Sequence, residues 1–134
     1  MQTTKQMLSS KTRKASDGTA YAACIDACVE CEVVCSACAD GCLGEQDIDA
    51  LRRCIRLDLD CADLCGTTAR LLARATDESG EALRATLTAC MRACAACARE
   101  CERHDMQHCQ ICAQVCRRCE ESCRQLESGV VSAA

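Results

Sequence analysis

Residues 24–42 read CIDACVECEVVCSACADGC, and six of these nineteen residues are cysteine. The intervals between successive cysteines are 4, 3, 4, 3 and 4 residues. Residues three and four apart share one face of an α-helix, so this spacing predicts a helix whose buried stripe consists of thiols. Charged residues such as Asp26 and Glu30 fall off the stripe, as expected of a helix that faces water on one side and a core on the other.

Three further segments repeat the stripe, with steps of 3, 4 or 7 residues. We predict four helices, over about residues 17–43, 47–75, 78–103 and 105–127. Their short connections predict an all-α fold, an antiparallel up-down-up-down four-helix bundle with every stripe facing the axis. The eighteen cysteines of the four stripes are Cys24, Cys28, Cys31, Cys35, Cys38, Cys42, Cys54, Cys61, Cys65, Cys90, Cys94, Cys97, Cys101, Cys109, Cys112, Cys116, Cys119 and Cys123.

The rest of the composition supports this fold class. The chain has 134 residues, which fits one domain, and it contains no proline, tryptophan or phenylalanine. Sustained β-branched alternation is absent from the sequence, so we expect no strands. We expect residues 1–16 to form a basic arm or a short extra helix, residues 17–127 the bundle, and residues 128–134 a tail. The expected N-caps are Asp17 or Ser16, Asp47, Asp77 and Asp105, and the expected stops are Gly44 and Gly129.

Charge and hydropathy exclude several classes of function. The net charge of −4 argues against nucleic-acid binding, although residues 1–16 carry +4 and leave −8 on residues 17–134. The N-terminal residues lack the apolar region of a secretory signal, and no apolar run approaches the roughly 20 residues of a membrane span. We therefore expect a cytosolic protein. Thiols stay reduced in the cytosol, so the cysteines are expected to hold metal rather than form disulfides.

The helical spacing also favours metal over disulfides. Side chains at i, i+3 or i, i+4 have Cβ atoms about 5–6 Å apart, whereas a disulfide requires roughly 3.5–4.5 Å. Zinc prefers closed sets of four ligands, and iron–sulfur motifs use tight runs that this chain lacks. Cu(I) suits soft thiolates and accepts two or three of them, so an unbroken column suits it best. Eighteen thiolates would hold about nine ions unshared, or about eighteen if each thiolate bridges two ions.

The two ends of the predicted column differ. Continuing the heptads toward one end gives an apolar plug, made of Tyr21, Leu72, Leu83, Leu87 and Leu126. The other end gathers Cys42, Asp47, Leu51, Cys54, Cys101 and Cys109.

The turn at this second end reads CERHDMQHC over residues 101–109 and contains both histidines of the chain. We interpret it as the entrance for metal, with His104, His108 and Met106 as outer ligands, because imidazole and thioether also bind copper. Asp58 and Thr68 are misfits, since both fall on the inward stripe. Either Asp58 forms hydrogen bonds at the edge of the column or its helix is rotated there.

Taken over residues 17–127, the cysteine stripes, the scarcity of aromatic residues and the His/Met-bearing end resemble the bacterial copper storage proteins, specifically their cytosolic branch. The resemblance implies a non-enzymatic store of many Cu(I) ions in a four-helix bundle, and it implies a homotetramer. Release from a deep thiolate core requires a competing ligand, so a copper chaperone or chelator is the expected delivery partner. The alternatives are a zinc or cadmium buffer and, ranked lower, a thiol-redox or iron–sulfur protein.

Overall fold

The computed structural model describes residues 2–16 and 18–133, and every regular element within them is helical. The all-helical class predicted from the sequence is therefore confirmed. None of the described helices is both long enough and apolar enough to cross a lipid bilayer. In chain order the elements are α1 (Gln2–Ser10), α2 (Gly18–Leu43), the 3-10 turn η1 (Asp49–Leu51), α3 (Arg52–Ala73), α4 (Gly80–Cys101) and α5 (Gln107–Ala133).

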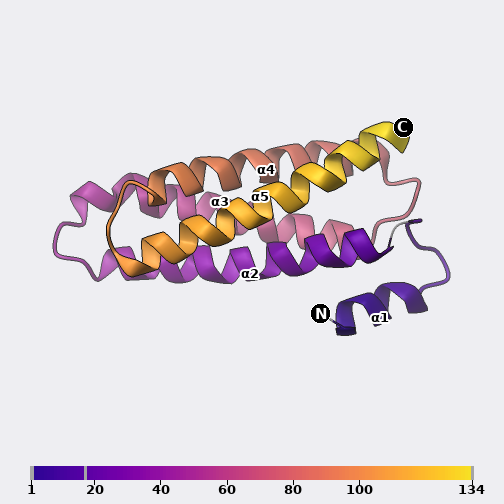
Figure 1. Ribbon diagram of the computed structural model, residues 1–134, viewed down its shortest axis with the longest axis horizontal. Coiled ribbons are helices and arrows are strands. Elements are labelled where there is room, and N and C mark those ends of the chain that lie inside the picture. The colour runs from indigo at the N-terminus through magenta and orange to yellow at the C-terminus, as the bar shows by residue number, and fades with distance from the viewer. Residues whose placement is uncertain (1, 17, 134) are drawn as a thin grey trace.

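The four long helices lie side by side in one bundle (Figure 1). Helix α2 packs against α3 and α5, and α4 packs against the same two helices, so the four enclose a common axis. The α2–α3 and α4–α5 connections lie at one end of the bundle, which we call the mouth. The α3–α4 connection, the start of α2 and the end of α5 lie at the opposite end, which we call the closed end.

The core of the bundle is built from thiols along most of its length. All eighteen cysteines are buried, each with at most 1% of its surface exposed. A free cysteine packs as a small hydrophobic residue, so the four stripes satisfy the requirement for an apolar helix face without large side chains. At the closed end the heptads continue with leucines. Leu72, Leu83, Leu87 and Leu126 are buried there, and Tyr21 is partly buried against the core.

Part of the basic N-terminal segment forms the short helix α1, which contacts α2 at the closed end. Leu8 is its one buried residue, and this side chain supplies apolar surface to the core. Beyond the helix, Lys11 donates a 2.9 Å hydrogen bond from Nζ to the carbonyl of Ala73, and Arg13 forms an ion pair with Glu78. The segment is therefore docked on the α3–α4 connection.

The last helix is longer than the sequence predicted. Gly129 was expected to end it, but α5 continues to Ala133, so the expectation of a tail over residues 128–133 is wrong. A glycine ends a helix by adopting a positive φ angle. Among the described residues only Gly80, the first residue of α4, has a positive φ angle, at 56°, and Gly129 keeps a helical backbone. Residue 134 lies outside the described residues.

Of the helix caps predicted from the sequence, the structure supports Asp47 but not Asp77 or Asp105. Asp47 accepts a hydrogen bond from the backbone N–H of Ala50, at the turn that leads into α3. Asp77 is not a cap, because its carboxylate accepts the backbone N–H and the hydroxyl of Ser16 instead. Helix α5 begins two residues after Asp105, so this residue is not its N-cap either. Asp17 lies outside the described residues.

Candidate metal centre

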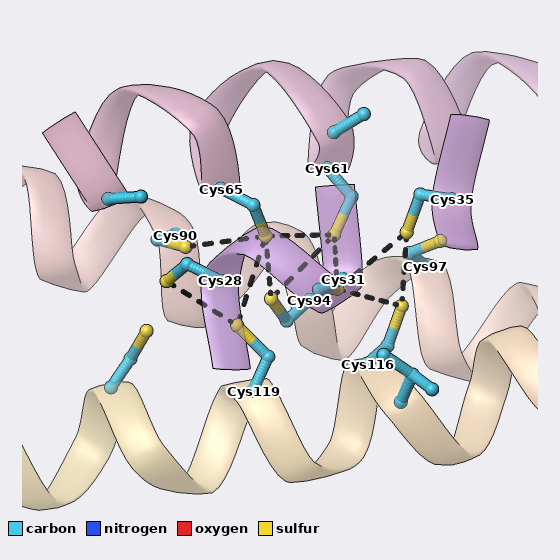
Figure 2. Packing of buried hydrophobic residues seen from close by; sticks show 14 of the residues in the cluster. Cys28, Cys31, Cys35, Cys61, Cys65, Cys90, Cys94, Cys97, Cys116 and Cys119 are labelled. Atoms are coloured by element: carbon cyan, nitrogen blue, oxygen red, sulfur yellow. Dashed lines mark hydrogen bonds between the residues drawn. The ribbon is translucent and has the colours of Figure 1, made fainter. Parts of the chain in front are cut away.

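The sulfur atoms of the four stripes form one continuous buried column. Figure 2 shows its middle part, where labelled cysteines of all four long helices point toward one another. All eighteen cysteines are free thiols. Between α2 and α5 the Sγ–Sγ distances are 3.8 Å for Cys24–Cys123, 3.7 Å for Cys28–Cys119, 3.5 Å for Cys35–Cys116 and 3.9 Å for Cys38–Cys109.

A second wall of sulfur runs between α3 and α4. Its Sγ–Sγ distances are 3.7 Å for Cys54–Cys101, 3.6 Å for Cys61–Cys94 and 3.8 Å for Cys65–Cys90. The two walls touch through Cys31–Cys61 and Cys65–Cys119, both at 3.8 Å. Each gap is shorter than two metal–sulfur bonds of about 2.3 Å. An ion between two of these sulfur atoms could therefore reach both.

The sulfur atoms also group into sets of four. In each set all ligand atoms lie within 4.8 Å of one another. Neighbouring sets share members, since Cys31, Cys35, Cys61 and Cys116 each belong to two of the three sets named below. Independent four-coordinate sites cannot all be filled when ligands are shared. The arrangement suits soft ions of low coordination number joined by bridging thiolates. Three of the sets are Cys31–Cys61–Cys65–Cys94, Cys31–Cys35–Cys61–Cys116 and Cys35–Cys97–Cys112–Cys116.

A further set of four thiols lies nearest the mouth, and it has an imidazole beside it. Nδ1 of His108 is 3.4 Å from Sγ of Cys38 and 3.6 Å from Sγ of Cys109. Burial raises the pKa of Cys109 to about 11 and also raises the pKa of Cys42. Cys42 and Cys109 therefore stay protonated in the metal-free protein at neutral pH. The set consists of Cys38, Cys42, Cys54 and Cys109.

His104 occupies a different environment from His108. Its Nε2 atom lies 2.8 Å from Oε2 of Glu100, a carboxylate that is only 5% exposed. Arg53 and Arg103 form ion pairs with the same carboxylate. The sequence interpretation did not single out Glu100. Its position four residues before His104 was the available signal, because such residues are neighbours on a helix.

Met106 lies between the two histidines in the α4–α5 connection and is partly buried against the core cluster. The structure thus gathers His104, Met106 and His108 at the mouth, and it brings the His108 ring within contact distance of the thiols.

Asp58 points into the column, and α3 is not rotated away at this position. Its Oδ1 atom lies 3.1 Å from Sγ of Cys97, 3.4 Å from that of Cys112 and 3.6 Å from that of Cys101. Burial, reinforced by repulsion from Cys112, raises the pKa of Asp58 to about 11. The side chain is thus a neutral acid at pH 7. The other misfit, Thr68, is buried and donates its hydroxyl to the carbonyl of Leu64.

Comparison with known proteins agrees with this geometry. The sequence profile of the copper storage protein family matches residues 17–128. A cysteine-rich protein of Bacillus subtilis, YhjQ, is 39% identical over 104 residues, which cover 78% of this chain and 93% of that protein.

Two solved structures are also similar. The copper storage protein Ccsp of Streptomyces lividans, loaded with 10 copper equivalents, is 42% identical and has a TM-score of 0.90. The match covers 94% of this chain and 98% of that one. The Cu(I)-bound copper storage protein BsCsp3 is 38% identical, with a TM-score of 0.70 over 77% of this chain and 93% of that one. This chain belongs to the copper storage protein family.

Proposed function

We propose that this protein stores Cu(I) as cargo, without catalysing a reaction, in the buried column of thiols. One observation carries the proposal: eighteen free thiols from four helices lie in a single core, with neighbouring Sγ atoms 3.5–4.0 Å apart. Soft thiolates select Cu(I), and sulfur atoms shared between neighbouring sets suit bridged two- or three-coordinate ions. The relatives support the choice of metal, because one was loaded with 10 copper equivalents and another bound Cu(I).

The ligands in this proposal are all eighteen cysteines, which would hold roughly nine to eighteen ions depending on how many thiolates bridge. His108, His104 and Met106 serve as outer ligands at the mouth, where ions enter. The direction of entry follows from chemistry. The mouth offers imidazole and thioether groups beside the thiols, whereas the closed end is plugged by leucines and covered in part by α1.

The setting of the protein is part of the same proposal. We infer an antiparallel up-down-up-down four-helix bundle that works in the cytosol, where thiols remain reduced. The Streptomyces relative is described as cytosolic, which supports this compartment. We further propose that the protein is a homotetramer and that a copper chaperone or chelator serves as its delivery partner.

Anaerobic titration of the reduced protein with Cu(I), followed by ion counting after gel filtration, tests this function. We expect saturation near or above nine ions per chain. Saturation at four or fewer would overturn the proposal. Competition with Zn(II) separates it from a zinc or cadmium buffer: Cu(I) should displace bound Zn(II), and the reverse result would favour the buffer.

A matched pair of variants ties the capacity to the column. Cys35 and Cys116 are 3.5 Å apart in the core. Replacing both by serine should lower the capacity by about one ion if thiolates are unshared, and by about two ions if each thiolate bridges two ions. Ser36 lies next to Cys35 on the exposed face of α2, and Ser36→Ala should leave the capacity unchanged. Equal capacities in the two variants would show that the ions bind elsewhere.

A further inference from the structure

The His108 ring lies directly against the backbone of α2 at Gly41. A Cβ atom at this glycine would lie 3.0 Å from Cγ and Cδ2 of His108 and 3.1 Å from Nδ1. Such contacts are tighter than those of ordinary side chains, so an alanine here would push the ring outward. Glycine inside a helix costs about 1 kcal/mol relative to alanine. The close approach of the His108 imidazole explains why a glycine is found at position 41 despite that cost.

The two ring nitrogens of His108 face different partners. Nδ1 faces the thiols, at 3.4 Å from Cys38 and 3.6 Å from Cys109. Nε2 lies 3.2 Å from Oε1 of Glu45, in the turn after α2. A carboxylate can only accept a hydrogen bond, so Nε2 must carry the proton. In the neutral ring Nδ1 is then the atom with a free lone pair, and it faces the sulfur atoms.

We propose that Gly41 and Glu45 are positioning residues for His108. Gly41 lets the ring approach the thiols, and Glu45 fixes the tautomer that turns the Nδ1 lone pair toward them. This inference rests on the proposed function, in which His108 receives Cu(I) at the mouth. Carboxylates that accept from the remote nitrogen of a histidine ligand orient the ring and raise its basicity. One short segment, residues 41–45, therefore positions the His108 ring beside the thiols nearest the mouth.

The tautomer can be measured without metal. The chain contains only two histidines, so a ¹⁵N-labelled, metal-free protein gives two imidazole spin systems, which His108→Ala assigns. At pH 8, where an imidazole is ordinarily neutral, we expect the Nε2–H form for His108. Glu45→Ala should shift this ring toward a mixture of tautomers. Glu45→Gln keeps an acceptor oxygen and should restore the Nε2–H form.

The rate of loading supplies the second readout. Transfer of the first equivalents of Cu(I) from its bicinchoninate complex, followed by stopped flow, should slow about tenfold in Glu45→Ala and Gly41→Ala. Two matched controls lie in the same region. Gly44→Ala meets only an ordinary 3.5 Å contact, and Asp40→Ala removes an exposed carboxylate from α2. Both should load at the wild-type rate.

Two results would overturn the inference. One is a Glu45→Ala protein that keeps the wild-type tautomer and loading rate. The other is a Gly44→Ala protein that slows as much as Gly41→Ala. If Gly41→Ala does not fold, as judged by circular dichroism, the Glu45 variants at the surface of the mouth decide alone. The total capacity of the wild type tests the proposed function separately, because a low capacity would leave the tautomer result unaffected.

Discussion

The carboxyl Oδ1 of Asp58 lies 3.1 Å from Sγ of Cys97 inside the buried thiol column. Two further thiols, those of Cys112 and Cys101, lie 3.4 and 3.6 Å from the same oxygen. Asp58 has no exposed surface, and burial is the main cause that raises its pKa to about 11. A neutral carboxyl can share hydrogen bonds with the surrounding thiols, whereas a carboxylate at this place would be strongly destabilising.

Asp58→Asn should therefore stabilise the metal-free protein at neutral and alkaline pH. The pKa of Asp58 rises from 3.8 to about 11 on folding, so folding takes up a proton between these pH values. The stability linked to this group is fully present below pH 3.8 and declines as the pH rises. Asparagine carries no such linkage, so the advantage of the variant should grow by at most about 1.4 kcal/mol per pH unit.

Urea denaturation of the reduced, metal-free proteins at pH 5, 6.5 and 8 measures this difference. Asp60→Asn changes an exposed carboxylate on the same helix and serves as the control, with an expected effect near zero at each pH. A gap between Asp58→Asn and wild type that stayed constant with pH would mean that Asp58 does not gain a proton on folding.

Loading the mouth should release protons, and its affinity should depend on pH. Burial raises the pKa of Cys109 to about 11 and raises that of Cys42, so both are thiols at pH 7 before metal binds. Each must lose its proton to become a ligand. As the pH falls, the apparent affinity for Cu(I) should weaken by about tenfold per pH unit for each proton released.

A weakly buffered Cu(I) titration with a pH indicator counts these protons. We expect close to one proton for every thiolate that becomes a ligand, and Cys42→Ser with Cys109→Ser should remove about two from the first equivalents. Loading of these equivalents with no proton release would show that the mouth thiols are already ionised.

The spacing of the cysteines was sufficient to predict the helices and the buried stripe. Intervals of 3 and 4 residues fit only one local geometry, and all eighteen cysteines are buried as that geometry requires. Helix ends were less predictable. Gly129 looked like a stop, but it keeps a helical backbone without a positive φ angle, and α5 continues past it to Ala133.

The supporting residues of the mouth could not be predicted in the same way. His108 stood out by its residue type, whereas its contacts with Gly41 and Glu45 join residues more than 60 positions apart in sequence. Such contacts depend on how the end of α2 meets the start of α5, which no local pattern encodes. Asp58 shows the same limit. Its inward position was visible in the sequence and hydrogen bonding was one of two open alternatives, but which thiols lie around it was not predictable.

Removing the Glu100 carboxylate should destabilise the mouth. Glu100 accepts from Nε2 of His104, which is largely buried, and from the exposed Arg53 and Arg103. When the carboxylate is removed, the exposed guanidinium groups can be solvated by water, but the largely buried imidazole of His104 loses its hydrogen-bond partner. We expect Glu100→Ala to lower the free energy of unfolding by about 1–3 kcal/mol, and Glu100→Gln to lower it by less, because one acceptor oxygen remains.

Denaturant unfolding of the metal-free proteins checks this order of stability. Asp105→Asn is the matched control, since Asp105 is an exposed carboxylate in the adjoining connection and its replacement should change little. Equal losses in Glu100→Ala and Asp105→Asn would show that Glu100 does not support His104.

The leucine plug should hold the fold when the column contains no metal. Leu87 is fully buried at the closed end, and truncation of a buried leucine to alanine typically costs about 2–5 kcal/mol. Leu59→Ala is the control, because Leu59 lies on the same bundle but is about half exposed. Bound ions stabilise the native state, so Cu(I)-loaded Leu87→Ala should unfold at a higher denaturant concentration than the metal-free variant, with unchanged capacity. If Leu87→Ala cost no more than Leu59→Ala, the thiol column alone would be holding the metal-free helices together.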